Sequence, residues 1–263
     1  MVAQPAELTL QVGPVSVRVS KAGQGDPLVY LHGAFGFQGW PPFLDRLAER
    51  FTVYAPLHPG FGEADDIESI DDTLELTLYH FDLLDALGLT SAHFVGHFFG
   101  AMIAAEVAAL CPHRVDRLVL ASPGGLWLDD NPGVDYFATP PSDLRGILFA
   151  DPDSEVAKHT MPELGSDEER AQQIFERARS LSTVGKFLWP IPDKGLRKRL
   201  HRIKASTLIV VADRDRIVPP VYGDEVASRV PGSRLHLFRD GGHLFMLERP
   251  GEFSDVVSAF LSE

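Results

Sequence analysis

Two segments late in the sequence carry side chains that suit acid–base chemistry together. Residues 211–219 follow an apolar run and contain Asp213 and Asp215, and the second segment is Gly241-Gly242-His243. A carboxylate in the loop after a strand accepts a hydrogen bond from a histidine Nδ1–H, which fixes the tautomer and favours the charged imidazole. Each segment taken alone is explained as well by an ordinary polar loop or turn. The spacing of the two favours a pair, and we choose Asp215 over Asp213 as the partner of His243.

A third candidate lies in the middle of the chain. Residues 92–95 are mostly apolar, Gly96–Gly100 reads Gly-His-Phe-Phe-Gly, and small or apolar residues, with Glu106 among them, continue from Ala101 to Leu110. This pattern predicts a strand, a tight turn and a helix, with Phe98 presented at the turn. A phenyl ring has neither a lone pair to attack a carbonyl nor a proton to give to a base. Its neighbours in the turn carry no hydroxyl or thiol, and Ser122 is interpreted as a turn residue before Pro123.

Composition limits the classes of partner. The chain has 263 residues, of which 44% are hydrophobic and 23% charged, with a formal net charge of −13. Because the chain is acidic and lacks long basic runs, we expect neither nucleic acid nor an anionic membrane as a partner. The N-terminus has no signal-peptide pattern, and no apolar run approaches the ~18 residues of a membrane span. A single cysteine, Cys111, rules out an internal disulfide and fits the cytoplasm, which is the predicted location.

No metal or cofactor is expected. His93 and His97 lie four residues apart, but they span a strand and a turn and so do not share a helical face for a metal. His97 is interpreted as a residue that packs beneath Phe98.

Apolar periodicity predicts an α/β fold. Alternation around Gly13-Pro14 indicates a hairpin, and one long helix is expected over 71–87 with Leu74, Leu78, Phe81 and Leu84 on one face. Because strands and helices alternate, the sheet is expected to be mostly parallel, with helices on both faces. The other expected strands are 27–31, 51–55, 115–121, 207–211 and 234–238, and the other helices are 41–50, 101–110 and 250–261.

The alternation stops between residues 123 and 204. This segment is rich in proline and in acidic, helix-favouring stretches such as 166–170. We interpret it as an inserted, mostly helical cap. The predicted core therefore consists of residues 1–122 and 205–263.

Together these motifs resemble the α/β-hydrolase fold family over nearly the full length of the chain. The turn at Phe98 is similar to the Gly-x-Ser-x-Gly nucleophile elbow of that family, and the order elbow, acid, histidine is the family's order. The other matching parts are His32-Gly33, the acid loop ending in Val218-Pro219, and Gly242-His243 followed by Glu248-x-Pro250.

The resemblance implies a hydrolase with an eight-stranded, mostly parallel sheet and a helical cap. It further implies Phe98 at the nucleophile position, Asp215 as the orienting acid and His243 as the base, with an oxyanion hole from the backbone N–H groups of Ala34 and Phe99. The expected substrate is a small hydrophobic ester, or a compound with a C–C bond beside a carbonyl. An aromatic hollow for this molecule is expected near Phe35, Phe37, Trp40, Phe99, Trp127 and Phe245. Of these, Phe35, Trp40 and Trp127 are predicted to bind the substrate.

Phe98 leaves three accounts of function open. The chain is a hydrolase that lost its nucleophile, an enzyme that uses His243 and Asp215 as a non-covalent general base (a lyase or cofactor-free oxygenase), or a ligand-binding pseudoenzyme. The fold is expected to tolerate the ring. A bulky residue at positive φ costs about 1–2 kcal/mol, and burial of the ring returns about 1.5–3 kcal/mol.

Overall fold

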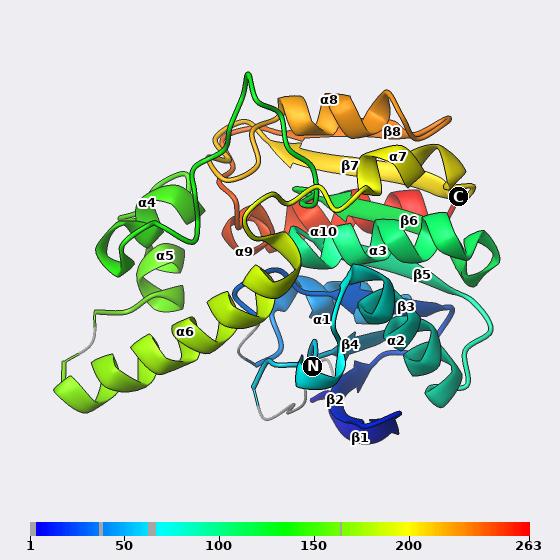
Figure 1. The fold of residues 1–263 in the computed structure, drawn as a ribbon, viewed down its shortest axis with the longest axis horizontal. Coiled ribbons are helices and arrows are strands. Elements are labelled where there is room, and N and C mark those ends of the chain that lie inside the picture. Colours follow the sequence, from blue (N-terminus) through cyan, green and yellow to red (C-terminus); the bar gives the residue numbers. More distant parts are fainter. Residues whose placement is uncertain (1–3, 37–38, 63–66, 164) are drawn as a thin grey trace.

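The computed structural model describes residues 4–36, 39–62, 67–163 and 165–263. Its centre is one eight-stranded sheet in the order β1-β2-β4-β3-β5-β6-β7-β8, with helices on both sides (Figure 1). This is the α/β-hydrolase architecture that the sequence predicted. The strands are β1 (Ala6–Val12), β2 (Val15–Ala22), β3 (Pro27–Leu31), β4 (Thr52–Pro56), β5 (Ala92–His97), β6 (Val115–Ala121), β7 (Ser206–Ala212) and β8 (Arg234–Phe238).

Strand direction brings the chemistry to one edge of the sheet. Strand β2 pairs antiparallel with both β1 and β4, whereas every pairing from β4 through β3, β5, β6 and β7 to β8 is parallel. Every residue of β5 is buried, because helices cover both faces of the sheet. The carboxyl ends of the parallel strands meet at one edge, and the loops that follow β3, β5, β6, β7 and β8 lie next to one another there.

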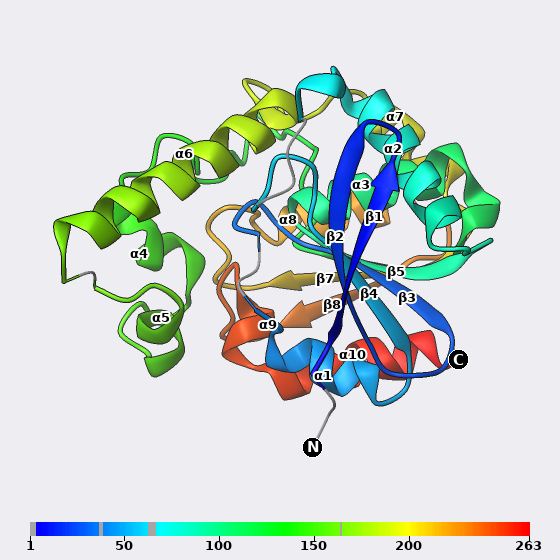
Figure 2. The ribbon, with the colours of Figure 1, turned by 90° about the horizontal axis from the view of Figure 1, so that it is seen from below.

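Two layers of helices cover the sheet (Figure 2). Helices α1 and α10 lie together on one face, and α2 and α3 lie on the other. The helices are α1 (Pro42–Ala48), α2 (Thr73–Ala86), α3 (Phe99–Leu110), α4 (Leu144–Leu148), α5 (Glu155–Thr160), α6 (Asp167–Leu188), α7 (Leu196–Arg199), α8 (Val221–Ala227), α9 (Phe245–Glu248) and α10 (Pro250–Leu261), with short 3₁₀ turns at Ile67–Ser69, Pro112–Arg114, Pro141–Asp143 and Leu200–Arg202.

The expected core face of α2 is wrong in part. Leu74 and Leu78 are 53% and 47% exposed, while the buried face includes Leu76, Tyr79 and His80 together with Thr77, Leu83 and Leu84. The predicted face passes over Leu76 and Leu83, because the polar His80 lies between them on that side of the helix. His80 can be buried there because its Nδ1–H donates to the Leu76 carbonyl within the helix.

Between β6 and β7 the described residues form helices and turns rather than strands. Helices α4, α5 and the first half of α6 lie beyond the carboxyl edge of the sheet, on the side to which β7 and β8 point (Figures 1 and 2). The second half of α6 returns to the core. There the Thr183 hydroxyl donates to the Gly60 carbonyl at 3.2 Å, and the Phe187 ring stacks on Phe99 at 5.8 Å.

Candidate active site

Phe98 stands alone between β5 and α3 in a backbone conformation that L-residues rarely adopt. Its φ and ψ are 48° and −103°. The turn is tight enough to need glycine at position 100, because a Cβ there would lie 2.1 Å from the Leu31 carbonyl oxygen. This close approach seats the start of α3 against the end of β3. Strand β5, the turn and α3 therefore have the strand–turn–helix geometry that the sequence predicted.

The Phe98 ring fills the space beside the histidine. Its centroid lies 5.0 Å from that of the His243 imidazole, with the two planes at 82°. On another side the ring meets Gly124, where a Cβ would come within 3.1 Å of the phenyl carbons. The Phe98 side chain is buried, so the ring occupies the hollow between the two loops.

Asp215 and His243 form a buried pair. The His243 Nδ1–H donates to Asp215 Oδ2 at 2.9 Å, and neither side chain is exposed to solvent. The second oxygen, Oδ1, accepts the backbone N–H groups of Ile217 and Val218, both at 2.9 Å. Because Nδ1 carries the proton, the other ring nitrogen of a neutral His243 has a lone pair. This Nε2 atom is buried and has no hydrogen-bond partner among the described residues.

Ser122 belongs to the same hydrogen-bonded group as Asp215 and His243, although the sequence predicts only a turn residue at this position. Its hydroxyl donates to Asp215 Oδ2 at 2.6 Å from the end of β6. The side chain is completely buried, and its φ is 43°. The sequence signal for this role was a serine directly after a predicted strand. This signal becomes informative once β6 is known to lie beside β7, the strand that precedes Asp215.

The loop that carries His243 is fixed from two sides. The Glu248 carboxylate accepts the backbone N–H of Gly242 through Oε2 and that of Ala150 through Oε1, both at 2.7 Å. The Leu244 N–H donates to the Leu148 carbonyl at 2.9 Å. The segment that includes the end of α4 and Ala150 therefore contacts the histidine loop directly.

His97 lies beneath the pair. Its Nε2–H donates to the His243 carbonyl at 3.1 Å, and the two imidazole rings are 4.7 Å apart. Burial, followed by the proximity of His243, holds the pKa of His97 well below its ordinary value. His97 is thus a neutral supporting side chain.

A second group of buried histidines joins the loops after β3 and β4. The His32 Nδ1–H donates to the Gly33 carbonyl, and His32 Nε2 accepts the His58 N–H at 3.0 Å. In return the His58 Nε2–H donates to the His32 carbonyl at 3.1 Å. Burial lowers the pKa of His32 and of the adjacent His80 to about 4, and that of His58 falls well below its ordinary value for the same reason. These neutral rings anchor the loop that contains Ala34.

Ala34 and Phe99, the expected oxyanion residues, lie at the ends of two neighbouring parallel strands. Phe99 is the first residue of α3, so its N–H has no partner within the helix. Ala34 is completely buried in the loop after β3. The Gly36 N–H closes that loop by donating to the Gly33 carbonyl at 3.1 Å.

The three aromatic residues predicted to bind the substrate have different surroundings, and Phe37 lies outside the described residues. Phe35 meets Tyr136 of the inserted segment edge-on at 4.6 Å. Trp40 is partly buried against the core, and the Trp127 indole N–H donates to Asp129 on its own loop. Phe35 thus makes a ring contact that crosses from the β3 loop to the helical segment.

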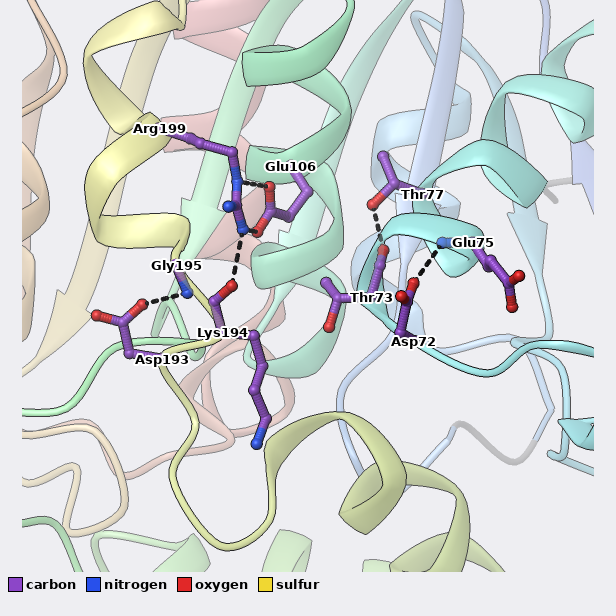
Figure 3. A network of polar contacts seen from close by, with 9 residues as sticks. All are labelled: Asp72, Thr73, Glu75, Thr77, Glu106, Asp193, Lys194, Gly195 and Arg199. Carbon is purple, nitrogen blue, oxygen red and sulfur yellow. Dashed lines mark hydrogen bonds and ion pairs between the residues drawn. The ribbon is translucent and has the colours of Figure 1, made fainter.

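Two surface hollows lie away from Phe98 and His243. One, of about 440 Å³, lies between the start of α2, α3 and α7, where Arg199 binds Glu106 through two hydrogen bonds of 2.7 and 2.5 Å (Figure 3). The other, of about 410 Å³, lies beside α4 and is lined in part by Arg145 and Arg216. Carboxylates line both hollows next to the cations, so neither has the charge of one sign that would select an ion.

The chain belongs to the alpha/beta hydrolase family, whose family model matches residues 28–256. It is similar to 2-hydroxy-6-oxo-6-phenylhexa-2,4-dienoate hydrolase of Comamonas testosteroni, with 29% identity over 94% of this chain and 91% of the relative. A 2-hydroxy-6-oxononadienedioate/2-hydroxy-6-oxononatrienedioate hydrolase of Escherichia coli is 31% identical over the same shares. Among solved structures, a meta-cleavage product hydrolase from Pseudomonas fluorescens IP01 superimposes with a TM-score of 0.78 at 22% identity, covering 97% of both chains.

Within the described residues, no three His, Cys, Asp or Glu side chains are grouped as metal ligands would be. None of the helices in that same part of the chain has the length and hydropathy that a membrane crossing requires.

Proposed function

We propose that this chain has the site of a hydrolase for a small hydrophobic carbonyl compound, in which Asp215 orients His243 as the base. The observation that carries the proposal is the buried pair, with His243 Nδ1 bound to the carboxylate and Nε2 left without a partner. A base needs such a lone pair directed toward the reacting group. The curated relatives named as 2-hydroxy-6-oxo-dienoate hydrolases favour a C–C bond beside a carbonyl over a simple ester as the reacting bond.

In this proposal Phe98 occupies the position of the attacking nucleophile. The positive φ between β5 and α3 supports that assignment. A phenyl ring cannot attack a carbonyl, so the acyl-enzyme route is closed in the chain as it stands. The backbone N–H groups of Ala34 and Phe99 are assigned to the oxyanion hole, and this pair survives a side-chain change at position 98 that keeps the geometry of the turn.

The proposal gives the inserted segment, residues 123–204, the role of a cap over the site. Its contacts with the loop after β3 and with the histidine loop support this role. Phe35, Trp40 and Trp127 are assigned to the apolar wall around the substrate, and Tyr136 joins them through its contact with Phe35.

A second candidate is a non-covalent general-base enzyme, a lyase or cofactor-free oxygenase. It is favoured by the hydrogen bonding of the carboxylate: both Asp215 oxygens are occupied, so the acid holds His243 in place although no nucleophile remains to be activated. A ligand-binding pseudoenzyme is the third account, and it predicts no role for His243 Nε2.

The experiment compares Phe98→Ser, Phe98→Ala and the unaltered chain on p-nitrophenyl butyrate and on a 2-hydroxy-6-oxo-dienoate. Phe98→Ala is the matched control, because it removes the ring without supplying a hydroxyl. Since one member of a catalytic triad is worth on the order of 10⁴–10⁶ in rate, Phe98→Ser should exceed Phe98→Ala by at least about 10³-fold. A serine-directed phosphonate should label Phe98→Ser alone.

The other outcomes separate the remaining accounts. If Phe98→Ser is inert while the unaltered chain turns over a carbonyl compound, and His243→Gln abolishes that turnover, the general-base function replaces the proposal. If no variant has activity but the unaltered chain binds a small apolar ligand, the chain is a binding protein.

A further inference from the structure

Ser122 holds a conformation that its side chain disfavours, at a point where the backbone is fixed. It follows the last residue of β6, and its N–H donates to the Val210 carbonyl of β7 at 2.8 Å. Its φ of 43° lies in the left-handed region, which glycine adopts without steric conflict. A glycine would therefore fit this position better on backbone grounds alone. Something other than the backbone accounts for a hydroxyl here.

The carboxylate of Asp215 supplies that reason. Its Oδ2 accepts two hydrogen bonds, one from the Ser122 hydroxyl at 2.6 Å and one from His243 Nδ1 at 2.9 Å. The two bonds to Oδ1 come from the loop of Asp215 itself. Among the described residues, Ser122 is thus the side chain besides His243 that binds this carboxylate from outside the loop.

Ser122 does not replace the missing nucleophile. Its proton is directed at Asp215 Oδ2, and the residue is completely buried. A nucleophile has to donate to His243 Nε2, which has no such partner among the described residues. The serine therefore acts on the far side of the pair, through the carboxylate.

We propose that Ser122 is a positioning residue that orients Asp215 and moderates how strongly Asp215 binds the His243 imidazole. A donor on Oδ2 takes up part of the negative charge that would otherwise act on Nδ1–H. Removing it concentrates that charge on the bond to His243. His97, a neutral imidazole at 4.7 Å, also faces the His243 ring, and the Glu248 carboxylate accepts the backbone N–H of Gly242 beside it.

The test uses Ser122→Ala and Ser122→Gly in the otherwise unaltered chain. Both remove the hydroxyl, but only glycine also removes the Cβ that disfavours positive φ. The readout is the downfield proton NMR resonance of His243 Nδ1–H, assigned by its loss in His243→Gln. We expect both variants to shift this resonance further downfield by the same amount. Ser122→Cys, which keeps a weaker S–H donor, should give an intermediate shift.

Thermal unfolding of the same variants separates positioning from simple structural support. Ser122→Gly should melt at or above the temperature of Ser122→Ala, because it relieves the backbone conflict. A resonance that stays in place in both variants overturns the proposal. So does a resonance that moves only in the less stable variant, because the shift then follows loss of structure rather than loss of the hydroxyl.

The consequence for catalysis rests on the proposed function, while the NMR readout does not. In a Phe98→Ser background, Ser122→Ala should move the acid limb of the pH–rate profile to higher pH. The proton concentration at the midpoint of that limb should fall on the order of threefold to tenfold. If Phe98→Ser is inert, the proposed function fails, and the resonance still decides the role of Ser122. An active Phe98→Ser protein with an unmoved acid limb overturns the role of Ser122 alone.

Discussion

Replacement of His80 by leucine should make the fold less sensitive to acid. His80 is buried on α2, where burial lowers its pKa from an ordinary value of 6.5 to about 4. It faces the rings of Tyr79 and His58. Its Nδ1–H donates to the Leu76 carbonyl, which also accepts the helical N–H four residues on. Leucine therefore leaves no orphaned polar group.

The sign and size of the effect follow from proton linkage. The folded chain keeps His80 neutral, whereas the unfolded chain protonates it below about pH 6.5. The contribution of His80 to the free energy of unfolding is therefore fully present above pH 6.5 and is lost as the pH falls toward 4. A folded pKa of about 4 corresponds to a loss of about 2 kcal/mol between pH 7 and pH 5. His80→Leu should remove that part of the loss.

The assay is urea unfolding at pH 7, 6 and 5, with the free energy of unfolding extrapolated to water. The unaltered chain should lose about 2 kcal/mol more than His80→Leu between pH 7 and pH 5. His201→Gln is the matched control, since that histidine is exposed, and it should follow the unaltered chain. Equal losses in His80→Leu and the unaltered chain would refute the claim that His80 is held neutral by burial.

Two further predictions concern the helices behind the site. Glu106→Gln should lower the free energy of unfolding by about 2–3 kcal/mol, since it leaves Arg199 without its charged partner; Arg199 is 30% exposed, which keeps the loss below that of a fully buried pair. The exposed Glu176→Gln is its control in urea unfolding, and equal stability of the two variants would contradict the argument. Leu76→Ala should cost about 2–5 kcal/mol, whereas Leu78→Ala should stay within about 0.5 kcal/mol. The reverse order in thermal or urea unfolding would mean that the face of α2 predicted from sequence is the buried one after all.

Local sequence determined most of the sheet. β3, β6 and β8 begin and end where the sequence pattern predicted them, as does α10. Strand β3 is buried between helical layers and is apolar throughout, so its pattern is readable without knowledge of its neighbours. The turn at Phe98 was readable from its two glycines: contacts with residues 100 and 101, a few positions on, require Gly96, although Gly100 is required by the end of β3, which only the folded chain brings there.

Tertiary structure decided what the polar residues do. The face of α2 was misjudged because His80 and Thr77 satisfy their own hydrogen bonds inside the helix and so can be buried. Ser122 was interpreted as a turn residue because its partner, Asp215, is 93 residues away. A short-range pattern reports which side chains avoid water, since that depends on each residue alone. Which donor meets which acceptor depends on the order of β6 and β7 in the sheet, and only the folded chain fixes that order.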